Sequence, residues 1–380
     1  MVKAACGWYG CDPPKIRRIR HVEEIQIGVV RSHAASILAK RTAWAGAAAL
    51  LALLAGPAQA AVTPTAVVVD PSFAAYTPTA TATDVAWEQN SAANPGSWNV
   101  RARSRSGGAS WQVNSVGSAG YNPSAVVGGT DTIIYQQAGS RDSNLLFYNL
   151  VTKTRKKAPA KVDSPLWEYY PEASTKYIAF MRLNSTSRLL LLYNRSHDSI
   201  TKIASVKKSC NFCLQPTFVG ASHLVYNQCS ASTYACTIRV LTIGGSSVNV
   251  PRQPAPHSTW GATYDESTGD VYYVNSTTWC GLFASVDRWN VSGASSPEVI
   301  VDFTEGIDGG STALAPDQAV PGDTDLLYSQ YDCISGDSDI WQVASVNTFA
   351  GTNPGALGQL SPSAGSRALP PRPGGSPPAG

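Results

Sequence analysis

Six short phrases of one design recur along the chain at nearly constant intervals. Each phrase has two small or apolar residues followed by an aromatic one: Val85-Ala86-Trp87, Ile133-Ile134-Tyr135, Ile178-Ala179-Phe180, Leu224-Val225-Tyr226, Val271-Tyr272-Tyr273 and Leu326-Leu327-Tyr328. The gaps between their aromatic residues are 48, 45, 46, 47 and 55 positions. A second apolar run follows each phrase, as at residues 189–193. A repeat of roughly 40–50 residues built from short apolar strands is typical of β-propeller blades.

The length of the repeating region agrees with this interpretation. Residues 84–361 give six units of about 46 residues each, the size of a four-stranded blade. Apolar alternation is short, turn residues are frequent, and no segment keeps a helical period of 3.6 for three turns. We therefore predict an all-β fold, a six-bladed β-propeller of four-stranded antiparallel blades. In the third repeat the expected strands cover residues 170–173, 177–181, 189–193 and 201–206.

Residues 1–60 form a leader that includes a secretory signal peptide. Lys40 and Arg41 precede an apolar run at 43–55, and Ala58-Gln59-Ala60 supplies small residues for cleavage. This order of charge, short apolar segment and cleavage site indicates export, and the run is too short to span a membrane stably. We expect a mature chain that begins at Ala61. We also expect it to be secreted, or periplasmic if the host is Gram-negative.

Two segments flank the predicted propeller. Residues 61–83 are rich in Ala, Thr and Pro, with a strand-like run at 66–69, and they form either a linker or a closing strand that pairs with the last blade. Residues 362–380 form a Pro- and Gly-rich tail that cannot bury a core, so we expect this tail to be disordered.

Charge gives no reason to expect an anionic partner. The leader carries 8 of the 29 Lys and Arg and 3 of the 26 Asp and Glu, which leaves 21 against 23 in the mature chain. This balance favours neither nucleic acid nor an anionic membrane as a partner. A basic cluster at residues 153–161 is interpreted as a solvated turn between two blades. We expect a monomer with no membrane span in the mature chain.

Six cysteines remain in the mature chain, an even number that indicates disulfides in an exported protein. Cys229 and Cys236 flank a six-residue loop between adjacent strands, so we expect them to pair. Cys280 and Cys333 follow the aromatic phrases of consecutive repeats at similar distances, and we pair these as well. Cys210 and Cys213 then pair by elimination. Zinc would need two suitably spaced ligand pairs, so we expect neither a metal nor a cofactor.

The repeat resembles that of TolB-type propellers, in which an inner strand with Pro precedes an apolar-aromatic strand and then a strand ending in an aromatic residue. The matching stretches are Pro171…Ile178-Ala179-Phe180…Leu191-Leu192-Tyr193-Asn194, Pro216…Leu224-Val225-Tyr226 and Asp337-Ser338-Asp339-Ile340-Trp341. The likeness covers about 280 residues and extends to exported TolB-like proteins of actinobacteria. The Ser-Pro-Asp-Gly turn typical of that family is absent. The resemblance implies the propeller fold and an exported protein.

Motifs that would indicate catalysis are weak or missing. Residues 104–111 resemble a sialidase Asp box, but serine replaces its aspartate and the box occurs once. The sequence contains no nucleophile elbow, zinc-protease motif, P-loop or dinucleotide fingerprint. Glycoside hydrolysis needs two carboxylates across one bond. The sequence spacing does not indicate which two of the candidate carboxylates would lie on either side of a bond. These candidates are Asp163, Glu168, Glu172 and Asp332.

Blade topology predicts a candidate binding face. In an antiparallel blade, the loop from the second to the third strand and the connection to the next blade emerge at the same end. This places the mature cysteines near one set of side chains: Trp167, Glu168, Tyr169, Tyr170, Trp260, Trp279, Tyr331 and Asp332. Exposed aromatics held by disulfides suit recognition. The competing interpretation is that these rings plug the central channel or pack between blades.

Two functions follow as hypotheses. The first is a secreted, non-catalytic binding or scaffold module for an unknown protein, peptide or cell-envelope glycan, with no catalytic residues assigned. The alternative is a hydrolase or lyase acting on a glycan or peptide in the propeller channel.

Overall fold

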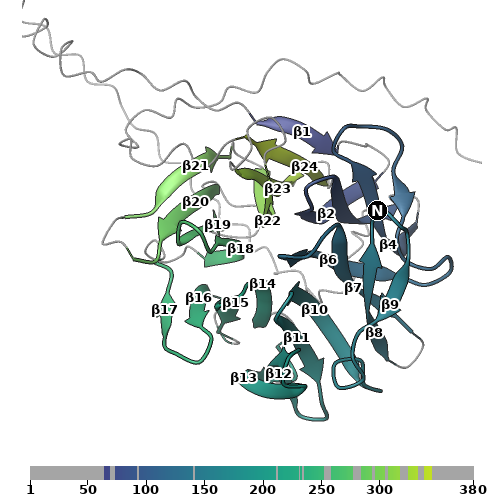
Figure 1. Cartoon of the computed structure of the whole chain (residues 1–380). Helices are drawn as coiled ribbons and strands as arrows, with labels where there is room; N and C mark the ends of the chain where they lie inside the picture. The colour runs from purple at the N-terminus through teal and green to yellow at the C-terminus, as the bar shows by residue number, and fades with distance from the viewer. Residues whose placement is uncertain are drawn as a thin grey trace, which may run out of the picture. The chain divides into compact units, whose positions relative to one another are not determined.

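The structure is a computed structural model, and it describes the greater part of the repeating region. The described residues are 64–68, 73–91, 94–139, 142–210, 213–230, 232, 235–251, 258–276, 284–292, 296–303, 307–316, 324–332 and 338–344. Every regular element in these residues is a β-strand, and the strands form antiparallel blades of four around a centre (Figure 1). The fold is therefore an all-β propeller, as predicted.

Three of the blades are separate sheets whose strands follow chain order. The first has β2 (Phe73–Ala80), β3 (Asp84–Ser91), β4 (Asn94–Ser104) and β5 (Trp111–Gln112). Another has β14 (Leu214–Val219), β15 (His223–Cys229), β16 (Cys236–Thr242) and β17 (Ser247–Asn249). The next has β18 (Ser258–Asp265), β19 (Asp270–Ser276), β20 (Ser285–Asn290) and β21 (Glu298–Asp302).

An eight-stranded sheet contains two further runs of four antiparallel strands. The first run is β6 (Gly120–Val127), β7 (Thr132–Ala138), β8 (Ser143–Asn149) and β9 (Arg155–Lys157). The second run is β10 (Trp167–Ser174), β11 (Tyr177–Leu183), β12 (Ser187–Asn194) and β13 (Ser199–Lys207). The two runs join through a short parallel pairing of β6 with β10. The four strands predicted for the third repeat all fall within β10–β13.

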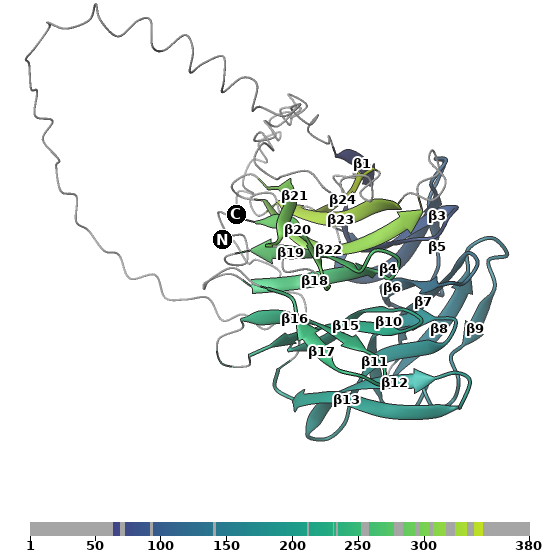
Figure 2. The same ribbon diagram turned by 60° about the vertical axis from the view of Figure 1, so that its left-hand side comes forward.

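The remaining blade is closed by the beginning of the described chain. It contains β22 (Ile307–Pro316), β23 (Thr324–Asp332) and β24 (Ser338–Val343), with β1 (Thr65–Val68) paired antiparallel to β24. Figure 2 shows β1 beside β24. The closing strand expected as one alternative for residues 61–83 is therefore present. The same segment also holds β2, so the first blade begins before the Asp84 boundary expected from sequence.

The recurring phrases explain how the blades pack. Each phrase lies in the second strand of its blade, and its aromatic residue is at most 4% exposed: Trp87, Tyr135, Phe180, Tyr226, Tyr273 and Tyr328. Because neighbouring blades cover both faces of a blade, the second strand is apolar on both sides. Phe180 and Met181 of the second strand β11 show this directly, since they belong to apolar clusters on opposite sides of one blade.

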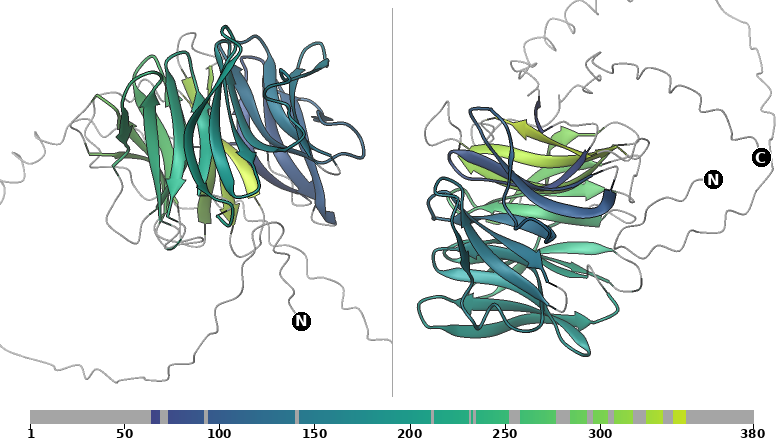
Figure 3. Two further views of the ribbon diagram at one scale, coloured as in Figure 1. Left: turned by 90° about the horizontal axis from the view of Figure 1, so that it is seen from below. Right: turned by 90° about the vertical axis from the view of Figure 1, so that its right-hand side faces the viewer.

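An apolar cluster fills the space between each pair of neighbouring blades. Leu145 and Phe180, for example, meet in the cluster between the β6–β9 and β10–β13 blades. Trp87 and Leu327 meet in the cluster between the first blade and the closing blade. The innermost strands β2, β6, β10, β14, β18 and β22 surround the centre, and the strands run between two faces of the ring (Figures 1 and 3).

Candidate functional site

One face of the propeller is defined by where the inner strands begin. In the β10–β13 blade, Trp167 at the start of β10 pairs with Leu183 at the end of β11. Ser187 at the start of β12 pairs with Lys207 at the end of β13. These ends therefore lie at the same edge of the blade, and the corresponding ends of the other blades lie there too. We call this side the entry face.

Aromatic side chains of β10 gather at the entry face. The rings of Trp167 and Tyr169 are stacked with centroids 6.1 Å apart, and Tyr170 follows at 6.4 Å from Tyr169. All three are partly exposed, and Leu166 before them is 41% exposed. Arg188 lies over Tyr169, with Cζ 5.6 Å from the ring centroid. Tyr169 and Tyr170 also pack against the cluster between this blade and the next, so the rings combine packing with exposure.

Glu168 corrects one expectation for the entry face. Its side chain is fully buried and forms an ion pair with Arg182, with Oε1 2.9 Å from Nε, while Ser164 donates a hydrogen bond to the same oxygen. Burial raises the pKa of Glu168 to about 7, against the effect of these two partners. Glu168 therefore anchors the start of β10 and offers no surface to a ligand. The sequence could not show this, because the alternation of buried and exposed side chains along β10 breaks between Tyr169 and Tyr170.

The other predicted residues come from different blades. Trp260 of β18 is partly exposed, and its indole N–H donates a 3.1 Å hydrogen bond to the carbonyl of Gly309 in the next blade. Tyr331 and Asp332 are partly exposed at the end of β23, opposite the start of β22. Trp279 lies outside the described residues. The structure thus places Trp167, Trp260 and Tyr331 at the entry ends of three blades.

A shared backbone feature sets the position of these aromatics. The pairing of each inner strand with its neighbour shifts register once along the strand. The last inner-strand residue before this shift pairs with the residue that follows the aromatic phrase of the second strand. In four blades this inner-strand residue is a partly exposed aromatic: Tyr76, Tyr121, Tyr169 and Trp260. The next residue has a positive φ in each case, from 48° to 58°. This bulge re-aims the side chains beside it.

Sequence reasoning missed part of this aromatic set. Tyr76 and Tyr121 lie on either side of Trp98 in β4, with ring centroids 5.7 and 6.1 Å from the indole. A signal for them exists, because Tyr76 and Tyr121 are each followed two residues later by proline, as Tyr169 is. The recurrence of Tyr-x-Pro could have identified the inner strands and their exposed rings.

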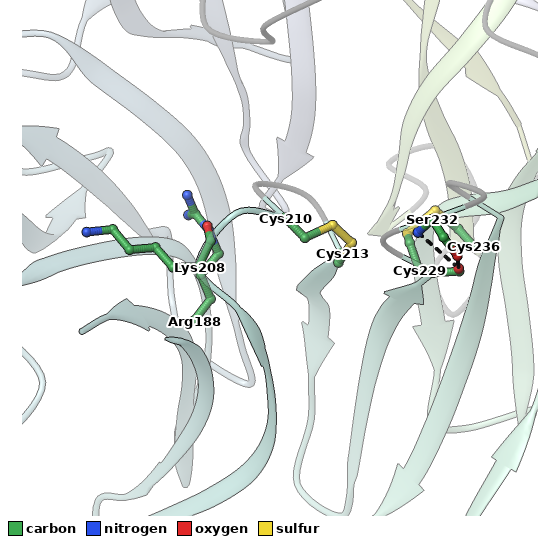
Figure 4. Close-up of a disulfide and its surroundings, with 8 residues drawn as sticks. Arg188, Lys208, Cys210, Cys213, Cys229, Ser232 and Cys236 are labelled. Carbon is green, nitrogen blue, oxygen red and sulfur yellow. Dashed lines mark hydrogen bonds between the residues drawn. A yellow bond between two sulfur atoms is a disulfide. The ribbon is translucent and has the colours of Figure 1, made fainter. Parts of the chain in front are cut away.

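Two disulfides lie at the entry face, with the pairing that the spacing predicts. Cys229 and Cys236 are directly opposite in β15 and β16, with Cα atoms 3.9 Å apart. Cys210 and Cys213 are joined before β14, with Cα atoms 5.4 Å apart. Figure 4 shows both disulfides. All four cysteines are buried in one cluster, and the Cys229 N–H donates to the Cys213 carbonyl at 2.8 Å. The expected Cys280–Cys333 pair lies outside the described residues.

A cavity of about 590 Å³ adjoins the Cys229–Cys236 disulfide. It is lined largely by polar side chains, including Gln228, Thr237 and Asn249. The Gln228 Oε1 atom is buried without a hydrogen-bond partner. This cavity belongs to the outer strands of one blade, so it is distinct from the aromatic positions on the inner strands.

Two carboxyl groups are held against the inner strand β6. Glu88 Oε2 accepts a 2.9 Å hydrogen bond from the Asn122 N–H, and Glu172 Oε2 accepts one of 2.6 Å from the Ser124 hydroxyl. Burial raises the pKa of Glu88 to about 7 and that of Glu172 to about 8. The catalytic candidates have separate partners. Glu168 pairs with Arg182, Glu172 accepts from Ser124, and Asp163 Oδ2 lies 3.6 Å from Lys157 Nζ. Glu172 thus contacts the same inner strand as Glu88, a residue the sequence did not single out.

Two absences hold within the residues that the structure describes. No group of three or more His, Cys, Asp or Glu side chains within them is arranged to hold a metal ion. Within the same residues, no helix has the length and hydropathy needed to cross a bilayer.

Comparisons with known proteins agree on the fold. No family model and no curated protein matches the sequence. A protein of unknown function from Dyadobacter fermentans has a TM-score of 0.50 at 11% identity, covering 76% of this chain and 98% of that one. TolB from Acinetobacter baumannii has a TM-score of 0.47 at 12% identity, covering 70% of this chain and 64% of that one. Identities this low show a likeness of fold alone.

Proposed function

We propose that this chain is an exported, monomeric, six-bladed propeller that acts as a non-catalytic binding module. Counting the eight-stranded sheet as two blades gives one blade for each aromatic phrase. An apolar cluster between every pair of neighbours supports that count. The signal-like leader and the disulfides support export, because disulfides persist in oxidising compartments.

The binding surface of this module is the entry face, and its ligand is a protein, peptide or cell-envelope glycan. The observation that carries this proposal is the repeated aromatic position on the inner strands, partly exposed at Tyr76, Tyr121, Tyr169 and Trp260. Aromatic side chains provide large contact areas with few rotatable bonds, and they are enriched among residues that dominate binding energy.

The test separates binding from packing at Trp260, one of these rings, and at Trp167, which is stacked with Tyr169. The mature protein is immobilised and used to capture partners from envelope extracts, with Trp167→Ala and Trp260→Ala compared with the wild type. Truncating a binding anchor costs a complex about 2 kcal/mol or more. Removing a buried aromatic costs the fold about 3–5 kcal/mol. We expect Trp167→Ala to lose the partner with an unchanged Tm.

Trp111→Ala is the matched control, because Trp111 is a partly exposed tryptophan on the outer strand β5. Trp260 donates a hydrogen bond to the next blade, so we expect its variant to lose some stability as well as the partner. A large fall in Tm for both Trp167→Ala and Trp260→Ala would show that these rings hold the blades together. The entry face would then be rejected as the site.

A second candidate is a hydrolase or lyase acting near the centre of the ring. Glu88 and Glu172 favour it, since both contact β6 and both have a raised pKa, as a general acid requires. The test is the release of fragments from envelope polymers by the wild type and by Glu172→Gln. Release that persists unchanged in Glu172→Gln would exclude this site.

A further inference from the structure

Charge is strongly separated along this chain, although the mature sequence as a whole is nearly balanced. Residues 153–208 contain twelve Lys and Arg but four Asp and Glu. Residues 214–343 contain three Lys and Arg but fourteen Asp and Glu. In Figure 1 the outer strands β9, β12 and β13 of the basic segment lie at the lower and right-hand edge, away from β20–β24. The fold therefore places the basic segment on one side of the propeller.

Side-chain alternation brings lysines from two blades to one edge. Lys156 of β9 pairs with Phe147, and Lys202 of β13 pairs with Leu191. Phe147 and Leu191 both belong to the apolar cluster between the β6–β9 and β10–β13 blades. Residues directly opposite on paired strands extend to the same side of a sheet. Lys156 and Lys202 therefore both extend on the side where these two blades meet.

The same edge holds further cations and few acids. Lys207 pairs with Ser187, two residues from Leu189 of the same cluster, so Lys207 lies on this side too. We call the exposed side chains Lys156, Lys202 and Lys207 the basic rim. Among the described residues, none of the three forms an ion pair. Lys161 nearby is paired with Asp198, the one exposed acid of the segment.

The basic rim continues into the aromatic part of the entry face. Lys208 follows Lys207, and the Arg188 guanidinium donates a 3.1 Å hydrogen bond to the Lys208 carbonyl (Figure 4). Arg188 in turn lies over Tyr169, which is stacked with Trp167. Arg188 alternates with Leu189 and so extends to the other side of this blade from the rim. The path of cations therefore runs around the entry end of the blade to the two stacked rings.

We propose that this path binds an acidic glycan, a linear polymer whose units combine a sugar ring with a carboxylate or phosphate. The inference rests on the proposed binding function and specifies its ligand. Lysines act as point charges for carboxylates and phosphates, while the aromatic faces provide flat apolar platforms for rings. Unpaired lysines along an edge attract a polyanion over several units. The wild type should show strong salt dependence, because each cation that contacts the polymer releases counterions.

The experiment measures binding of alginate oligomers, a carboxylate-bearing glycan, at several salt concentrations. Lys156→Gln/Lys202→Gln removes one charge from each blade at the rim. Lys153→Gln/Lys176→Gln is the matched control, because it removes the same charge from exposed lysines in turns at the opposite face. We expect the rim variant to bind about tenfold more weakly, with the slope of log K against log salt reduced by about one per contacting lysine. The control should bind as the wild type does.

Other probes test the class of partner. Equal loss in the rim and control variants, or equal binding of neutral dextran, would overturn the proposal. Tighter binding of a single-stranded oligonucleotide of equal charge would assign the path to nucleic acid instead, and binding only to anionic vesicles would assign it to membranes. Salt-sensitive self-association seen by light scattering would identify a second copy of this chain as the occupant.

The proposal and the function on which it rests can fail separately. If the rim variant still retains the envelope partner while Trp167→Ala loses it, the acidic glycan is rejected and the entry face remains the binding surface. If Trp167→Ala loses neither alginate nor the envelope partner, both are rejected.

Discussion

Arg105 of the first blade forms an ion pair with Asp325 of the closing blade, across 220 positions of sequence. Arg105 Nη2 lies 2.5 Å from Asp325 Oδ2, and both side chains are less than 10% exposed. Gln342 of β24 donates a second hydrogen bond to the same carboxylate oxygen at 2.8 Å. The pair therefore joins the two blades that close the ring.

Removing one partner of this pair should destabilise the propeller strongly. Arg105→Met leaves the Asp325 carboxylate buried without its cation, a change that costs about 3–5 kcal/mol. Lys161→Met is the matched control, because its pair with Asp198 is more than half exposed on both sides and worth at most about 1 kcal/mol. Denaturant unfolding of both variants measures the difference. Equal stability of the two would show that ring closure does not depend on Arg105.

The bulge of the inner strands gives a second prediction. Gly261 has a φ of 58°, and a Cβ added there would meet the Gly310 carbonyl and lie 2.7 Å from the Ser311 Cα. Gly261→Ala should therefore cost about 2 kcal/mol or more, from the left-handed backbone and the backbone clash together. Thr77 has the equivalent place with a φ of 48°. Thr77→Gly should leave the Tm within a few degrees, since relief of strain offsets the added chain entropy. A harmless Gly261→Ala would disprove the close approach.

Buried carboxyl groups should make stability fall as pH rises. The pKa of Glu172 is raised by burial to about 8 in the folded state, while the unfolded chain has the ordinary value of 4.5. The folded state thus binds more protons between these values, and its stability declines from about pH 5 to pH 8. Glu172→Gln should flatten this decline in Tm, although Glu88 retains part of it. Asp198→Asn, at an exposed carboxylate whose pKa is lowered by Lys161, should leave the profile unchanged.

The third disulfide remains a prediction from sequence. We expect a non-reduced peptide map of the secreted protein to contain Cys280–Cys333 beside Cys210–Cys213 and Cys229–Cys236. Cys229→Ser/Cys236→Ser should lower stability by about 2 kcal/mol, near the low end for disulfides because the enclosed loop is short. Reductant should abolish the stability difference between wild type and variant. A peptide linking Cys213 to Cys229 would contradict the pairing.

The sequence contained enough to predict the architecture because its strongest signal is also the physical basis of the fold. Phe180 and Tyr226 end their phrases in second strands, and those strands must be apolar on both faces. The strands with weak patterns were harder to place. β2 combines small residues with Thr77 and Pro78, and this composition resembles a linker until β3 provides the pairing partner.

The candidate site could be predicted only in part because burial depends on which neighbours a strand meets. Trp167 and Glu168 are adjacent in sequence, yet the first is partly exposed and the second is buried against Arg182. From sequence alone, the basic cluster at 153–161 reads as a solvated turn. The lysines that complete the basic rim, Lys202 and Lys207, lie more than 40 residues further along the chain. Only the meeting of two blades unites these lysines.

The pairing of β1 with β24 sets the order in which this protein can be completed. Thr65 of β1 is synthesised before every other blade strand that the structure describes, and its partner Gln342 is synthesised after nearly all of them. Until then β1 is an unpaired strand and the first blade lacks its last neighbour, so the earlier blades cannot close into a ring. Such long-range pairing folds slowly and leaves strand edges open to aggregation. Correct folding of this chain therefore depends on protecting an unfinished ring until its final blade has been synthesised.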